Sequence, residues 1–212
     1  MTSGRADANR RRILDVALTE LLRDPDASMD QIARAAGVVR RTVYGHFPSR
    51  EALIAALVDN ATAAVIEAHA TGRAGIGDPA EALASATLAV WEIADRYRLL
   101  VALAQRSVTM AGIKQRLTPV RETCTALIQH GLDEGAFTSP LTAAALAYVH
   151  EQALFGLMEA VNEGALPAAE GGAAAASTLL MTAGVPASRA AEVVGAALER
   201  GDGSRAGVSG RS

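Results

Sequence analysis

The sequence predicts an all-α protein with a small N-terminal helical domain followed by a larger helical one. Half of the 212 residues are apolar, which is enough to bury a sizeable core, and only 3% are aromatic. Much of the apolar content is alanine, which favours helices and is depleted in strands. Apolar residues recur at helical spacing along most of the chain. We therefore expect about nine or ten helices and no strand.

Three short helices are predicted at the N-terminus. The first covers residues 9–23, where apolar side chains recur on one helical face. Ser28 and Gln31 have the Ser-x-x-Gln spacing of a capping box, which opens a second helix that ends at Gly37. The third covers residues 39–47 and ends because a proline follows it.

The second and third helices have the spacing of a helix-turn-helix over roughly residues 28–47. Such a pair needs a tight turn and small residues where the helices cross. Gly37 can adopt a positive φ, and Ala33 allows the two backbones to approach closely. Val43 supplies an apolar contact. Helix pairs of this kind also occur in proteins that never bind DNA, so the spacing alone leaves both interpretations open.

The third helix presents side chains that suit a DNA groove. Its exposed positions are predicted to be Arg40, Arg41, Thr42, Tyr44 and His46. Such side chains can reach base edges and phosphates in a major groove. The free N–H groups at the start of the next helix, after Ser49, can bind a phosphate with Arg50 beside them. The alternative interpretation is a polar face that is merely solvated.

The charge distribution agrees weakly with a DNA-binding N-terminus. The whole chain has a net charge of −3. Residues 1–50 contain nine Arg and six acids, a net of +3, whereas residues 51–212 contain eleven basic and seventeen acidic residues, a net of −6. A basic N-terminal segment followed by an acidic remainder suits a protein whose N-terminal segment contacts phosphates.

Residues 29–53 resemble the DNA-binding signature of the tetracycline-repressor (TetR/AcrR-like) family. The matching pieces are Ile-Ala-x-x-Ala-Gly-Val at 32–38, Val-Tyr-x-His-Phe at 43–47 and Ser-Arg-Glu-Ala-Leu at 49–53. The helix over residues 9–23 also fits, and the rest resembles the family only in the number, order and length of its helices. The resemblance implies a homodimer that reads a near-palindromic double-stranded operator and is released by a small-molecule inducer.

The resemblance also assigns DNA contacts by position in the motif. Thr42 and Tyr44 would contact bases or phosphates, Arg40 and Arg41 would lie at the groove, His46 and Arg50 would contact phosphates, and Ser28 would cap near the DNA backbone. Two positions depart from the usual pattern. Val39 stands where Ser or Thr commonly caps the recognition helix, and Gly45 lies inside that helix, where it removes a side chain that could read the operator.

The remaining helices are predicted from apolar periodicity and from Pro, Gly and capping signals. Their expected ranges are 49–69, 78–95, 97–107, 112–132 with an entry or kink near Pro119, 140–163 opened by Ser139-Pro140, 168–183 and 186–200. We expect a DNA-binding domain at 1–50, a ligand-binding and dimerisation domain at 51–200, and a disordered Gly- and Ser-rich tail at 201–212. The helices at 140–163 and 168–183 resemble the family's dimer interface.

The ligand pocket is expected among residues 55–160. Its candidate lining residues are Trp91, Tyr97, Gln105, Met110, Cys124, Phe155 and Met158, and further polar candidates are His130, His150, Glu151 and Gln152. For each of these residues, a place in the core or at the dimer interface is the alternative interpretation.

Other classes of function have little support in the sequence. No nucleophile elbow, phosphate-binding loop or zinc motif is found, so we expect no catalysis, no metal and no cofactor. The single cysteine, Cys124, forms no intrachain disulfide and is expected to be buried and inert. No signal peptide or membrane span is expected, so the cytoplasm is the predicted location. An activator of the same fold and a helical interaction protein that no longer binds DNA remain open as alternatives to a repressor.

Overall fold

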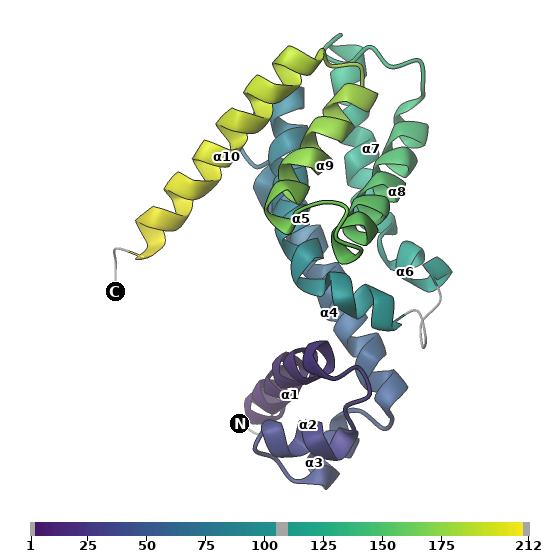
Figure 1. Cartoon of the computed structure of the whole chain (residues 1–212), viewed down its shortest axis with the longest axis vertical. Helices are drawn as coiled ribbons and strands as arrows, with labels where there is room; N and C mark the ends of the chain where they lie inside the picture. The colour runs from purple at the N-terminus through teal and green to yellow at the C-terminus, as the bar shows by residue number, and fades with distance from the viewer. Residues whose placement is uncertain (1–2, 105–109, 210–212) are drawn as a thin grey trace. The chain divides into compact units, whose positions relative to one another are not determined.

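The computed structural model describes residues 3–104 and 110–209 and, within them, ten α-helices and no strand (Figure 1). The helices are α1 (Ser3–Arg23), α2 (Met29–Ala35), α3 (Arg40–His46), α4 (Arg50–Gly72), α5 (Pro79–Ala104), α6 (Met110–Arg116), α7 (Thr118–Asp133), α8 (Ala143–Asn162), α9 (Ala168–Thr182) and α10 (Ala187–Ser209). The predicted all-α class, with a helix-turn-helix near the N-terminus and a larger helical part after it, is confirmed.

The chain divides into two compact units. The N-terminal unit comprises Met1–Thr62 and Tyr97–Arg116, and the C-terminal unit comprises Ala63–Arg96 and Leu117–Ser212. The limits of these units fall inside α4, inside α5 and between α6 and α7. The domain ranges 1–50 and 51–200 therefore stay predictions.

The N-terminal unit is organised around the inner faces of α1, α2, α3 and the start of α4. Side chains from all four helices are fully or almost fully buried: Ile13, Leu14, Ala17, Leu21, Ile32, Val43, Leu53, Ile54 and Leu57. Helix α2 opens with the predicted capping box, in which Ser28 and Gln31 satisfy each other's backbone N–H groups. Gly37 adopts a φ of +64° and lets the chain turn from α2 into α3.

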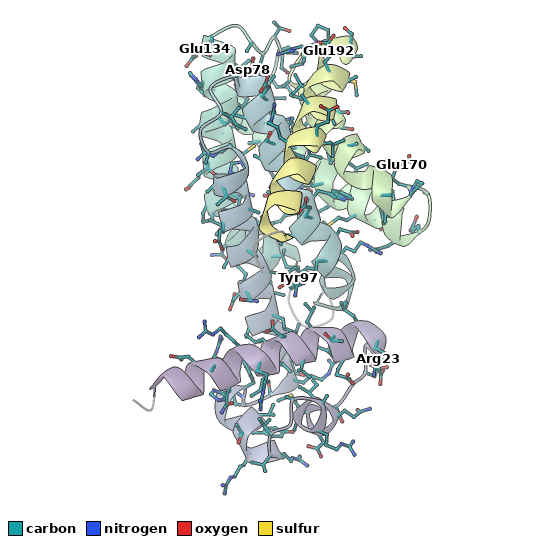
Figure 2. All side chains as sticks on the ribbon, turned by 90° about the vertical axis from the view of Figure 1, so that its left-hand side faces the viewer. Arg23, Asp78, Tyr97, Glu134, Glu170 and Glu192 are labelled. Atoms are coloured by element: carbon teal, nitrogen blue, oxygen red, sulfur yellow. The ribbon has the colours of Figure 1, made fainter. Side chains whose placement is uncertain are left out.

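The C-terminal unit packs α7, α8, α9 and α10 with the first half of α5 around an alanine-rich core. A large apolar cluster includes Leu83, Ile128, Leu146, Leu180 and Val193. The start of α5 at Asp78, the end of α7 at Glu134 and Glu192 on α10 lie at one end of this unit (Figure 2). Arg189 of α10 is 3.6 Å from the carboxylate of Asp78 there.

A second cluster in the C-terminal unit forms where Trp91 of α5 lies against α9. A Cβ added at Gly171 would stand 2.1 Å from Trp91 Cζ2, and one added at Gly172 would stand 3.2 Å from Trp91 Cδ1. The indole ring therefore occupies the space that side chains at these positions would fill. Met158, Val161 and Ala175 complete the cluster around it.

Several helix limits differ from the sequence prediction. Helix α1 begins at Ser3 and not at residue 9, and the helix expected at 112–132 is divided into α6 and α7 at Leu117, close to the expected kink at Pro119. The two helices expected at 78–95 and 97–107 are one continuous helix, α5, because no proline or glycine interrupts the chain between them. Helix α8 is capped by the Thr142 side chain and not by Ser139, which lies in the preceding turn. Helix α10 continues to Ser209, so the tail expected to be disordered from residue 201 is helical as far as residue 209. No proline ends α10 near Arg200.

Helix α4 is long and apolar enough, by length and composition alone, to cross a membrane. The sequence prediction had found no such stretch. Leu53, Ile54 and Leu57 are nevertheless buried in the core of the N-terminal unit, and the same helix carries Asp59 and Glu67. A core helix of a folded protein has this composition too, so the finding is weak evidence for a membrane.

Substitution of Gly171 is expected to disrupt the Trp91 cluster. Gly171→Ala places a methyl group against the indole ring, and we expect it to lower the free energy of unfolding by about 1–3 kcal/mol. Gly195→Ala is the matched control, because a Cβ there meets open space in the middle of α10 and should stabilise the helix by about 1 kcal/mol. Urea unfolding measures both, and equal effects of the two variants would contradict this account of the packing.

Buried His150 is expected to weaken the fold in mild acid. Burial lowers the pKa of His150 from 6.5 to about 4. Between these pH values the unfolded chain binds a proton that the folded chain does not, so stability falls as the pH decreases, by up to about 3 kcal/mol. His150→Gln can still donate to Thr182 and should lose this part of the pH dependence in urea unfolding at pH 7 and 4.5. His130→Gln, at an exposed position, should keep it; an unchanged pH dependence in His150→Gln would refute the assignment.

Candidate nucleic-acid interface

Helices α2 and α3 form the predicted helix-turn-helix within the N-terminal unit (Figure 1). Ala33 is buried where the helices approach, and its carbonyl oxygen accepts a hydrogen bond of 3.0 Å from the Val38 N–H after the turn. Val43, on the inner face of α3, has no exposed surface. The opposite face of α3 is thereby held outward.

The outward face of α3 carries the residues expected to contact DNA. Arg41 and Tyr44 are exposed, and Thr42 and His46 are half-buried. Arg41 forms no hydrogen bond or ion pair with any residue that the structure describes. Its guanidinium group is therefore free to pair with an external anion.

Arg40, in contrast, is engaged by its neighbours. Its Nη1 atom donates a hydrogen bond of 2.8 Å to Asp30 Oδ2 of α2. The guanidinium carbon lies 5.1 Å from the centre of the Tyr44 ring, and Nη2 is 3.4 Å from the Tyr44 hydroxyl. Asp30, Arg40 and Tyr44 therefore form a connected group, the Asp30–Arg40–Tyr44 cluster, that joins α2 to the face of α3.

Two predicted DNA-contact residues have structural partners. Ser28 caps α2, as expected, and its hydroxyl also lies 2.7 Å from Gln31 Oε1. Arg50 donates hydrogen bonds to the carbonyl oxygens of Pro25 and Ala27, in the loop between α1 and α2. The guanidinium group of Arg50 thus holds this loop to the start of α4, a role that the sequence pattern did not reveal.

Both departures from the family pattern have structural consequences. Val39 occupies the N-cap of α3, is exposed and supplies no side-chain hydrogen bond, as the sequence predicted. A Cβ at Gly45 would meet nothing within 4 Å, so no close packing requires glycine there. Helix α3 therefore lacks both a cap and one outward side chain.

Helix α1 adds basic side chains that the sequence analysis did not single out. The Arg10 guanidinium lies 5.4 Å above the Phe47 ring and so covers the end of α3. Arg11 and Arg12 are exposed and pair with no residue in the described part of the chain, as is also true of Arg34 on α2. These cations share the N-terminal unit with the exposed face of α3, and an apolar-periodicity analysis of α1 could not assign them a role.

The residues predicted to line a ligand pocket do not form one group. Trp91, Phe155 and Met158 belong to one apolar cluster, whereas Cys124 packs against the larger cluster of the C-terminal unit. Tyr97 falls in the N-terminal unit. Gln105 and the side chain of Met110 lie outside the described residues.

The further polar candidates form structural contacts within the C-terminal unit. The Arg121 guanidinium is 2.5 Å from Glu151 Oε2, and Gln152 also donates to Glu151. His150 Nε2 lies 3.0 Å from Thr182 Oγ1 and joins α8 to α9. His130 is exposed and lies 3.5 Å from Glu134. Within the described residues, no group of His, Cys, Asp or Glu has the arrangement of a metal site.

Two residues with buried polar atoms, His69 and the half-buried Arg73, were missed by the sequence analysis. His69 is only 5% exposed, its Nδ1 atom lies 3.3 Å from Thr123 Oγ1, and burial lowers its pKa to about 4. His69 Nε2 and Arg73 Nε are both buried and have no hydrogen-bond partner among the described residues. Only the contact between α4 and α7 reveals them, and no local motif could have done so.

Sequence comparison matches residues 13–57 to the family described as bacterial regulatory proteins, tetR family. The regulator TtgW of Pseudomonas putida is 42% identical over 59 residues, which are 27% of this chain and 44% of TtgW. The repressor LfrR of Mycolicibacterium smegmatis is 46% identical over 55 residues, which are 26% of this chain and 29% of LfrR. The chain thus matches less than half the length of these curated relatives.

The structural matches extend over most of the chain. The TetR-like regulator LfrR from Mycobacterium smegmatis, solved with proflavine, matches with a TM-score of 0.64 and 22% identity, over 83% of this chain and 96% of that one. FadR from Bacillus subtilis, solved with stearoyl-CoA, matches with a TM-score of 0.69 and 15% identity, over 81% and 98%. These likenesses establish the fold of the C-terminal unit but not its ligand.

The family match runs from the middle of α1 to the start of α4 and so includes the helix-turn-helix, and the structural match to LfrR covers 83% of the chain. Residues 13–57 are thus similar to the tetR family of bacterial regulatory proteins, and the fold of the described chain is TetR/AcrR-like.

Proposed function

We propose that the protein is a dimeric transcriptional repressor that binds operator DNA through α2 and α3 and is released when the C-terminal unit binds a small molecule. The observation that carries the proposal is the face of α3. It presents Arg41, Thr42 and Tyr44 outward while Val43 anchors the helix inward, inside a segment that matches a family of regulatory proteins.

The charges of the N-terminal unit support DNA as the partner. Arg41, Arg34, Arg11 and Arg12 have no anionic partner among the described residues, so their positive charge is not neutralised within the chain. Cations of this kind pair with phosphates and release counterions, which provides most of the affinity for DNA. Thr42 and Tyr44 then supply contacts to base edges or to the sugar-phosphate backbone.

Dimerisation is proposed through α8 and α9. Tyr148 and Val149 of α8 and Met181 of α9 are large apolar residues that are exposed in the single chain. A second copy related by two-fold symmetry would cover such a surface with the same surface of its own. Two recognition helices about 34–36 Å apart then enter successive major grooves, which explains a near-palindromic operator.

Release by a ligand is proposed as a shift between two populations of the dimer. LfrR has been solved with proflavine and FadR of Bacillus subtilis with stearoyl-CoA, so two neighbours of this fold hold small organic molecules. A ligand that prefers a dimer with altered spacing weakens DNA binding by its difference in affinity for the two states. Bound at an operator, the dimer excludes polymerase, and this function belongs in the cytoplasm.

Specific DNA binding that depends on Arg41 is the first expected result. Fluorescence anisotropy with DNA from the protein's own upstream intergenic region, over a salt series, should show a steep salt dependence and a preference over scrambled DNA. Arg41→Ala should weaken binding by about 1–2 kcal/mol and reduce the salt slope by about 1. Arg189→Ala removes the same charge from α10 and should change neither.

Equal binding of scrambled DNA, together with wild-type behaviour of Arg41→Ala, would contradict this assignment of α3. Genomic fragments retained on the protein provide the second source of operator DNA, since the operator need not lie beside the gene. Transcription of a reporter gene then distinguishes a repressor from an activator, because a repressor lowers this transcription and an activator raises it.

Removing the Asp30 carboxylate is expected to change the affinity of the protein for the phosphates of DNA. Asp30→Asn frees Arg40 from its ion pair and removes a negative charge from the same surface. We expect tighter binding to all DNA sequences and a salt slope larger by about 1, while discrimination against scrambled DNA falls because Tyr44 loses a fixed neighbour. Glu20→Gln, which removes an acid on α1 that pairs with Arg23, is the control. An unchanged slope would mean that Arg40 never reaches a phosphate.

A further inference from the structure

The end of α4 brings an unusual set of polar atoms against α7, inside the C-terminal unit. His69 is buried there, and Thr123 of α7 lies 3.3 Å from its Nδ1 atom. Gly72, one turn further along α4, packs so closely on α5 that an added Cβ would be 2.8 Å from Ala89 Cβ. The position of this end of α4 is therefore fixed by its contact with α5.

The hydrogen bonds of Thr123 favour one of the two neutral forms of the His69 ring. The Thr123 hydroxyl has one proton, and it donates to the carbonyl oxygens of Val120, at 2.9 Å, and Pro119, at 3.2 Å. Its oxygen is left to accept from His69, which favours a neutral ring that carries its proton on Nδ1. His69 Nε2 is then a bare acceptor, and it is buried with no partner among the described residues.

Arg73 places an unpaired donor near this bare acceptor. Arg73 follows His69 by four residues, a spacing that places both on one side of the end of α4, and its Nε–H is buried without a partner in the described part of the chain. Leaving a buried polar group unpaired costs about 1–3 kcal/mol, and more for a charged group. His69 Nε2 lacks a hydrogen-bond donor, and the Arg73 Nε–H lacks an acceptor. A ligand group that can both donate and accept a hydrogen bond would satisfy both atoms.

The other neighbours do not satisfy these atoms. Burial raises the pKa of the Cys124 thiol to about 12, so the thiol stays neutral beside Arg73. Cys124 also packs against the apolar cluster of the C-terminal unit, which supplies an apolar wall. Arg73 forms no ion pair with any carboxylate of the described residues. An incoming anion would therefore be the first to neutralise it.

We propose that His69 and Arg73 bind the carboxyl group of a small organic acid, and that this acid is the signal sensed by the C-terminal unit. One carboxyl oxygen accepts the Arg73 Nε–H, and the other shares a proton with His69 Nε2. A carboxyl group suits this pair because its two oxygens lie side by side and can meet both partners at once. The assignment rests on the proposed function and specifies the chemical class of its ligand.

Binding requires a proton, which gives the site a measurable signature. At neutral pH a free carboxylic acid is ionised and His69 is neutral, because burial holds its pKa at about 4. In the complex one proton must lie between the carboxyl oxygen and Nε2, since two lone pairs facing each other repel. The complex therefore takes up one proton from solvent, and affinity falls by about tenfold for each unit of pH above neutrality. Arg73 acts on His69 by its charge and Thr123 by its hydrogen bond, and neither changes charge in this range.

Isothermal titration calorimetry of the full-length protein with small carboxylic acids and their methyl esters tests the proposal. Benzoate, phenylacetate and octanoate are each compared with their methyl esters, at pH 7 in phosphate and in Tris, whose different ionisation heats report the protons taken up. We expect at least one acid to bind at least about tenfold more tightly than its ester, with uptake of one proton. Proton uptake should disappear in His69→Phe, and affinity should fall at least about tenfold in Arg73→Met.

Matched variants separate a ligand site from a structural one. His130→Phe and Arg189→Met make the same changes at exposed positions and should leave binding of the acid unchanged. Without ligand, His69→Phe and Arg73→Met should unfold at a higher urea concentration than wild type, because each removes an unsatisfied buried group. Destabilised variants that bind no acid would show instead that an ordered water bridges the two residues, and would overturn the proposal.

Two further outcomes would also overturn it. If the acids and their esters bound with equal affinity, the carboxyl group would not be what the protein recognises. If an acid bound without proton uptake, His69 would not share a proton with it. These measurements contain no DNA, so they stand independently of operator binding. An acid that binds here but leaves the protein on its operator would support the site and contradict only the ligand-release part of the proposed function.

Discussion

Burial of one side of α3 is the interaction on which the proposed DNA-binding surface depends. The helix has seven residues, no side-chain cap and an internal glycine, and an isolated helix of that length would not be stable in water. Val43 and Phe47, both almost completely buried, hold it against the core of the N-terminal unit. The tertiary contact, and not local propensity, therefore determines which side chains face outward. The positive φ of Gly37 and the capping box of α2 set the direction from which α3 begins.

The C-terminal unit contains two buried histidines that differ in their surroundings. His150 joins α8 to α9 through Thr182, and His69 joins α4 to α7 through Thr123. Each ring has one nitrogen paired with a threonine and one buried nitrogen without a partner. Only His69 has a cationic donor beside it that is itself unpaired. This difference is why the two similar side chains are assigned a structural role and a binding role respectively.

Local signals were sufficient to predict most of the fold, and contacts between distant segments account for what was missed. The capping box, the glycine turns and the apolar periodicity each involve residues that lie close together in the sequence. Helices α1 to α4 and α9 could therefore be placed from the sequence. The choice between Ser139 and Thr142 as the cap of α8 depends on the path of the preceding loop. The partner of Arg50 lies 25 residues earlier, and that of His69 lies 54 residues later. No local pattern indicates such pairs, so the loop contact of Arg50 and the polar atoms at His69 needed the folded structure.

The two parts of the chain resemble their relatives to different degrees, and the physics of their partners explains the difference. The matched N-terminal segment is 46% identical to LfrR, whereas the structural match to LfrR over most of the chain has 22% identity. Under the proposed function, every operator offers the same phosphate spacing and the same groove, which constrains the side chains on α2 and α3. A small-molecule site must instead match one ligand, and only the helices that carry it need to stay the same. The identity of the ligand therefore has to be argued from atoms such as His69 Nε2 and Arg73 Nε, because resemblance of the helices carries no information about it.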